Sequence, residues 1–355
     1  MKRTLLFFRA LGAALVLAAE LFFLSVAPVS CSMGSEDEPG SPGIKIQSAA
    51  PPVLESFTVD SADRMTVRFD KEVSVTDATL SPSGGGGGPV PVSCEDCGDG
   101  KTVRMLFSGG TEIGRPYDLN ATAGDADGNS LSFRISFDGF NDRPPELILY
   151  EVRNAYSSKS NKYEFIRLYC GKGGNLSGLE VLSAGDGEAK AFAFPPVEVS
   201  AGDYVTVHLR KMKGDDGSWK QAGMTDEDSG DIRASTATDS SDDAWDFWQD
   251  NQKSRLSPSD IVMLRRRADG EVLDALLFRD PKKEADGWDG KYAPFCRAVA
   301  DSGAWLDEGG NPSSDYAGAF AAAGITSSAV TRTIRRRSPN LRPSSAADWE
   351  VVQAK

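Results

Sequence analysis

The chain has 355 residues and a formal net charge of −13. An acidic protein repels the phosphate backbone, so nucleic acid is not expected as a partner. His208 is the single histidine, which leaves little scope for Ser-His-Asp chemistry or histidine-rich metal sites. We therefore predict no catalytic residues, no metal ligands and no cofactor.

The N-terminus has the layout of an export signal. Lys2 and Arg3 precede an apolar run over residues 5–29, and a polar stretch follows Cys31. We predict a lipoprotein-type signal peptide over residues 1–30, cleaved so that Cys31 becomes the lipidated N-terminal residue. The acyl chain would make the membrane a partner and place the protein in the cell envelope, periplasmic or surface-exposed.

Two other fates of this segment stay open. Pro28 stands where the usual lipobox has leucine, which leaves room for cleavage after Ala27 or Ser30 without lipid. The segment could also remain as an uncleaved anchor. Arg9 and Glu20 argue against that outcome, because charges at the centre of a bilayer cost free energy.

A flexible tether and a β-domain follow the signal. Residues 31–51 are polar and rich in proline and glycine, without a pattern that could form a core. Apolar residues then alternate with polar ones over 65–69, 103–107 and 131–137, which is typical of half-buried strands. We predict a β-sandwich over residues 52–142.

Four cysteines remain once Cys31 is set aside, and two of them form a CxxC motif, Cys94 and Cys97. Zinc would need two further ligands at matching spacing, and no second CxxC exists. The intervening Glu95 and Asp96 should raise the thiol pKa, which opposes a role in disulfide exchange. We predict a structural disulfide between Cys94 and Cys97.

Asp125, Asp127 and Asn129 could begin a calcium-binding loop. The EF-hand pattern would then need glycine at Ser130 and an acidic residue at Ser136, and both positions fail. We predict a plain turn between two strands.

A second β-domain is predicted over residues 143–355, and the proline pair Pro144 and Pro145 marks the boundary with the first. Residues 163–170 carry apolar side chains on both faces, which indicates a central, sandwiched strand. His208 lies in an alternating strand, 204–209, and is expected to face the surface.

Two insertions, at about 211–258 and 281–331, interrupt this domain. The first holds an acidic run, 226–231, interpreted as solvated charge in preference to a calcium site. The second is expected to form a short helix over 316–323. Three aromatic residues of the first insertion could stack on sugar rings but are predicted to cover a sheet edge or the rim of the core: Trp245, Phe247 and Trp248.

Two triplets of arginine, residues 265–267 and 335–337, stand out on this acidic chain. They could hold an anionic headgroup, a phosphate or an acidic polymer. We interpret them instead as compensation for the many carboxylates nearby, because exposed ion pairs are common.

The first β-domain resembles the SbsA-like bacterial Ig-like domain of surface-layer proteins and lipoproteins, through F-D-K-E-V at residues 69–73 and D-x-D-G-N at 125–129. That resemblance implies a spacer or adhesion-type module. The second domain resembles the lamin-tail domain through E-F-I-R-L-Y at 164–169 and G-D-Y-V-T-V at 202–207. It departs from that family at Arg167. Both families imply an Ig-like sandwich, so the fold expected is all-β with two tandem Ig-like domains.

Function at this stage divides into three hypotheses. We favour a non-catalytic envelope lipoprotein, a binding or architectural module on a tether, with a protein or glycan as possible ligand. The alternative is an exported enzyme or enzyme accessory of nuclease or phosphatase type, which lamin-tail domains accompany elsewhere. The third is a purely structural envelope protein with no ligand.

Overall fold

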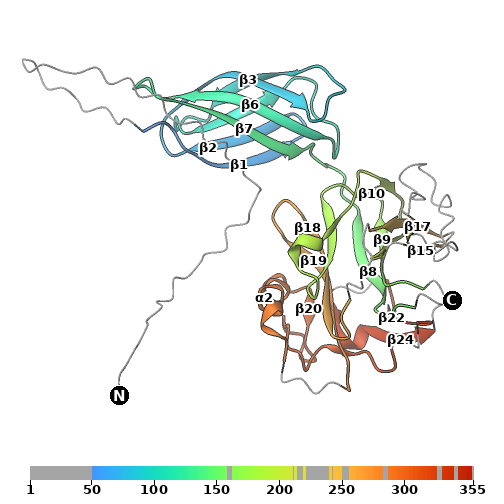
Figure 1. Ribbon diagram of the computed structural model, residues 1–355. Helices are drawn as coiled ribbons and strands as arrows, with labels where there is room; N and C mark the ends of the chain where they lie inside the picture. Colours follow the sequence, from blue (N-terminus) through green and yellow to red (C-terminus); the bar gives the residue numbers. More distant parts are fainter. Residues whose placement is uncertain are drawn as a thin grey trace, which may run out of the picture.

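The computed structural model describes residues 50–157, 162–210, 212–213, 219–220, 240–241, 243–249, 256–282, 287–325, 330–339 and 343–353. The predicted signal peptide, Cys31, most of the tether and the acidic run 226–231 lie outside the described residues. The described part is mostly β, in two bodies, which confirms the predicted fold class (Figure 1). None of its helices has the length and hydropathy to span a bilayer.

The first body is built from seven antiparallel strands. Their spatial order is β1-β2-β5-β4-β3-β6-β7. The strands are β1 Leu54–Ser61, β2 Arg64–Phe69, β3 Ser74–Pro82, β4 Val90–Asp96, β5 Thr102–Phe107, β6 Pro116–Gly124 and β7 Ser130–Asp138.

Apolar residues alternate with polar ones along these strands, and the apolar ones form the core of this body. Met65 of β2 pairs with Met105 of β5, and Val67 pairs with Val103. All four are buried, whereas the polar residues between them face outward. Burying a side chain of this size stabilises the fold by about 1.5–3 kcal/mol, so the period-two pattern is enough to place these strands.

The second body is a sandwich of two sheets. One has the order β12-β11-β18-β19-β21, and the other has the order β17-β14-β9-β8-β22-β24. Its strands are β8 Glu146–Arg153, β9 Phe165–Lys172, β10 Gly174–Asn175, β11 Leu179–Ser183, β12 Phe192–Ala193, β13 Glu198–Val199, β14 Tyr204–His208, β15 Met212–Lys213, β16 Trp219–Lys220, β17 Ala244–Trp248, β18 Asp260–Arg266, β19 Val272–Arg279, β20 Trp305–Leu306, β21 Phe320–Ala321, β22 Arg332–Arg336, β23 Ser344–Ser345 and β24 Trp349–Gln353.

Strand β9 is central in the six-stranded sheet, as predicted. Ile166, Leu168 and Cys170 are fully buried in the core shared with the five-stranded sheet. Phe165 and Tyr169 point to the opposite face, away from that core. A separate hydrophobic cluster fills the first body, between Leu54 and Ile135.

The predicted helix over 316–323 is wrong. That stretch contains a turn and the short strand β21, which pairs with β19. The α-helix α2 lies earlier, at Ala293–Ser302, with Pro294 in its first turn and Gly303 ending it at φ 67°. Proline near the start and glycine past the end are helix signals, so the sequence did mark this helix. Three 3-10 turns complete the fold: η1 Glu188–Lys190, η2 Gly290–Tyr292 and η3 Ala346–Asp348.

Candidate functional site

The outer face of the six-stranded sheet carries polar and aromatic side chains in an ordered grid. Because side chains alternate along a strand, every second residue of β9, β14 and β17 lies on this face. The register aligns them into rows: Tyr169 opposite Tyr204; Arg167 opposite Thr206 and then Asp246; Phe165 opposite His208 and then Trp248.

The first row holds three tyrosines, which we call the tyrosine row: Tyr150, Tyr169 and Tyr204. The ring centroid of Tyr204 lies 5.2 Å from that of Tyr150 and 5.5 Å from that of Tyr169. All three are half-buried. Burial, with Tyr150 close by, raises the pKa of Tyr204 to about 12. The phenol therefore keeps its proton at neutral pH and can donate a hydrogen bond.

The second row fixes a guanidinium beside the tyrosines. Arg167 donates from Nε to Thr206 Oγ1 at 2.9 Å, and its Nη1 lies 3.6 Å from Glu151 Oε2. Thr333 Oγ1 in turn donates to Glu151. The Arg167 guanidinium carbon lies 6.0 Å from the ring centroid of Tyr204. One hydrogen bond and one ion pair therefore orient the Arg167 side chain in the absence of a ligand.

The third row corrects the expectation that His208 faces the surface. Its side chain is buried, with Nε2 2.7 Å from Asp246 Oδ1 and the ring stacked on Trp248 at 3.8 Å and 9°. Phe165 meets the ring edge-on, and Asp246 Oδ2 accepts the backbone N–H of Ser241. The reason is β17, which lies inside the predicted insertion yet pairs in parallel with β14.

The aromatic residues of β17 cover a sheet edge, as predicted. β17 is the outermost strand of its sheet, and Phe247 is fully buried in the domain core. Trp245 also faces the core and donates from Nε1 to Asp203 Oδ2 at 3.2 Å. Trp248 points to the outer face, so these three rings do not form one platform for a ligand.

The fully buried and the partly exposed side chains of this face can have different roles. His208, Asp246 and the neighbouring Glu164 are fully buried. Burial raises the pKa of Glu164, although Arg210 opposes the shift. A general acid or base must reach its substrate, and side chains without exposed surface hold the sheet together instead. The half-exposed tyrosines and Arg167 can stack on a ligand and hydrogen-bond to it.

Another buried carboxylate, Asp260, lies at the start of β18. It accepts hydrogen bonds from Ser183 Oγ and from the backbone N–H groups of Gly185, Ser257 and Ile261. Burial raises its pKa to about 6 despite these donors. Both carboxyl oxygens of Asp260 are therefore used to hold the loops at Gly185 and Ser257 against the sheet, which is a structural role.

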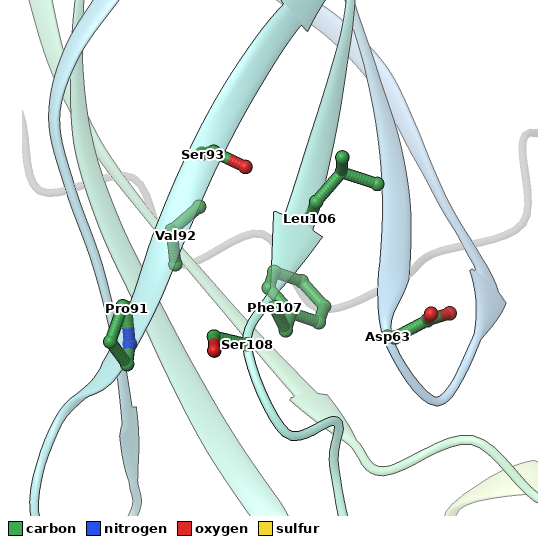
Figure 2. Close-up of a pocket in the computed structure, with 7 residues that line it drawn as sticks. All are labelled: Asp63, Pro91, Val92, Ser93, Leu106, Phe107 and Ser108. Carbon is green, nitrogen blue, oxygen red and sulfur yellow. The ribbon is translucent and has the colours of Figure 1, made fainter.

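A shallow pocket of about 300 Å³ lies on the first domain, beside β4, β5 and the turn between β1 and β2 (Figure 2). Among its lining residues, Asp63 is the single titratable side chain. Its hydrogen bond from Ser61 lowers its pKa, so it remains ionised. The pocket lacks the second group that acid–base chemistry needs. The residues that line it are Asp63, Pro91, Val92, Ser93, Leu106, Phe107 and Ser108.

The four cysteines of the described residues are free thiols in this structure. Cys94 is half-buried in β4, and burial raises its pKa. Cys97 is exposed in the following turn. The disulfide between them stays a prediction. Within the described residues, no group of three or more His, Cys, Asp or Glu side chains could hold a metal ion.

Carboxylates contact the first arginine triplet. Arg265 contacts Glu180 and Glu188, and Arg267 Nη1 lies 3.1 Å from Asp138 Oδ2. These contacts agree with the interpretation that the triplet compensates nearby negative charge.

The second triplet has one buried member. Arg335 and Arg337 lie 4.0 and 3.1 Å from Glu350. Arg336 is fully buried, and its Nη2 lies 2.9 Å from Asp274 Oδ1 in β19 of the other sheet. It therefore joins the two layers of the sandwich.

The Asp125 motif is a turn, as predicted. Asp125 Oδ1 accepts the backbone N–H groups of Asp127 and Asn129, and the Asp125 carbonyl accepts the N–H of Gly128. Lys71 Nζ lies 3.4 Å from the same carboxylate. These bonds close the connection between β6 and β7.

The fold and this face define a two-domain β-sandwich protein. Residues 145–351 match the family TP_1001_2nd, described as a protein second domain, and the chain belongs to that family. The chain is 27% identical over 195 residues to an uncharacterized protein of Treponema pallidum (strain Nichols). The match covers 53% of this chain and 47% of that protein, so this chain spans less than half of its relative.

Two solved structures show weaker similarity. The N-terminal part of the bacterial S-layer protein SbsC is 11% identical with a TM-score of 0.25, over 64% of this chain and 43% of that one. A DUF4876 family protein from Bacteroides thetaiotaomicron is 13% identical with a TM-score of 0.31, over 75% of this chain and 83% of that one. Both scores are below 0.5, so neither structure enters the functional argument.

Proposed function

We propose that this chain is a non-catalytic, lipid-anchored protein of the cell envelope. The observation that carries the proposal is the basic, apolar and polar order of its first residues around Cys31. Export followed by acylation would leave the two β-domains outside the cytoplasm on a tether of about twenty residues.

The second domain is then the binding module. The half-exposed tyrosine row beside the oriented Arg167 supports this role, because Tyr and Arg are the residue types that dominate the energetics of protein interfaces. Tyrosine rings also stack on sugar rings, so a protein or a glycan of the envelope is the proposed ligand. The first domain acts as the spacer that its resemblance to bacterial Ig-like domains implies, and the second is a divergent lamin-tail domain.

The anchor is tested by cell fractionation. Cys31→Ala should move the protein from the membrane fraction to the soluble fraction, because it removes the acylation site. Unchanged membrane partition would contradict the anchor.

The binding face is tested by capture from solubilised envelopes with purified protein as bait. Tyr169→Ala and Tyr204→Ala should lose the captured material. Tyr316→Ala, which alters a half-buried tyrosine elsewhere in the same domain, should keep it. Treatment of the captured material with protease or with glycosidase separates a protein ligand from a glycan. Equal capture by all variants would contradict the binding face.

A further inference from the structure

The segment that joins the two domains, residues 141–145, docks on the second domain. The backbone N–H of Asn175 donates to the carbonyl of Arg143 at 2.7 Å. The Arg143 guanidinium makes two hydrogen bonds to the Glu198 carboxylate, at 2.9 and 3.0 Å. A bidentate pair of this kind fixes orientation as well as distance, so the segment does not behave as a free linker.

Asn141 ties the end of the first domain to the second. Its Nδ2 donates to the carbonyls of Asn175 and Ser177, both at 2.8 Å, and its Oδ1 accepts the N–H of Arg143. The amide nitrogen of Asn141 thus donates to the second domain, while its oxygen accepts from the linker. An acid of the same shape could not do this.

Glycines let the two bodies approach more closely than side chains would allow. A Cβ on Gly114 of the first domain would lie 2.5 Å from Ser177 Oγ and 2.7 Å from Pro196 Cβ of the second. A Cβ on Gly174 would lie 2.2 Å from the carbonyl oxygen of Arg143. A side chain at either position would force its neighbours to shift. The backbone of Gly114 therefore packs directly against the second domain, and that of Gly174 packs directly against the linker.

An ion pair crosses the same boundary. Arg267 Nη1 lies 3.1 Å from Asp138 Oδ2, with both side chains more than two fifths exposed. Exposed pairs contribute little free energy, so the hydrogen bonds of Asn141 and the close packing at Gly114 contribute most to the contact.

We propose that these contacts form a fixed joint, so that the two domains move as one rigid body. Domains of one chain usually move relative to each other unless their interface is well packed. The joint goes beyond the proposed function, because it holds with or without a lipid or a ligand. It would hold the tyrosine row at a set orientation to the first domain.

The direct test is ¹⁵N relaxation on the chain from residue 32 onward, which keeps every described residue. A fixed joint gives both domains the same rotational correlation time. Two different correlation times would overturn the proposal, whatever the variants below do.

Two variants locate the joint, each with a matched control. Asn141→Asp turns the donor that faces two carbonyls into an acceptor, and Asn120→Asp makes the same charge change on an exposed position of β6. Gly114→Ala adds a Cβ against Ser177. The control Gly128→Ala shares a positive φ, 87° against 68°, but nothing lies within 4 Å of its Cβ.

In both joint variants the correlation time of the first domain should fall roughly two-fold, and both controls should match the parent. A parent with one correlation time and joint variants that keep it would also overturn the proposal, since the contacts named would then not form the joint. If Gly114→Ala does not fold, Asn141→Asp decides.

Discussion

Replacing Arg336 with methionine should destabilise the second domain strongly, because it leaves Asp274 buried without its counter-charge. The two side chains are 0% and 1% exposed, and Asp274 also accepts the backbone N–H groups of Leu149 at 2.8 Å and Ala275 at 3.1 Å. Breaking a buried ion pair by removing one partner costs about 3–5 kcal/mol. These backbone donors remain in the variant and place the expected loss near the lower end of that range.

The neighbouring residue supplies the control. Arg337 is 57% exposed and lies 3.1 Å from Glu350, so Arg337→Met should cost less than about 1 kcal/mol. Urea unfolding followed by tryptophan fluorescence measures both losses. Asp274→Asn combined with Arg336→Met should lose less than the sum of the single variants, because the pair is removed together. Equal losses for Arg336→Met and Arg337→Met would refute the argument.

Three further outcomes are expected. Burial raises the pKa of Asp260 from 3.8 to about 6, so its contribution to stability is full below pH 4 and is lost as pH rises through 6, by roughly 3 kcal/mol. Asp260→Asn should be less stable, and its unfolding free energy should lack this dependence on pH. Parallel pH profiles of unfolding free energy for the two proteins would contradict the prediction. Thiol titration of the exported protein should find Cys94 and Cys97 oxidised; two free thiols there would contradict the disulfide. His208→Ala should cost about 1–3 kcal/mol in unfolding free energy, because it removes the hydrogen bond between His208 and the buried Asp246. A loss of only a few tenths would mean that the pair is not structural.

The strands were predictable where local alternation and burial agree. Residues 65–69 follow period two, and the structure places Met65, Val67 and Phe69 in the core of the first body. Residues 163–170 are apolar on both faces, and the structure places Ile166, Leu168 and Cys170 in the core of the second body. The environment of His208 was not predictable, because it depends on a strand about forty residues away that lies between segments without a strand pattern. Even so, Trp245 and Phe247 are apolar and flank the polar Asp246, which is the alternation that could have identified β17.

The arginine triplet 335–337 shows the same limit of sequence reasoning. Compensation of nearby charge was the right interpretation for Arg335 and Arg337, which lie on the outer face beside Glu350. Alternation turns Arg336 to the opposite face, but its partner Asp274 is 62 positions away in the other sheet. No local pattern reveals a pair across two layers, and the tyrosine row also depends on three strands meeting in register.

Mass spectrometry of the N-terminal peptide, prepared from membranes of cells that express the whole chain, tests the central claim most directly. The account predicts a peptide that begins at Cys31 and carries acyl chains. A peptide that begins elsewhere, or an unmodified Cys31, would contradict it.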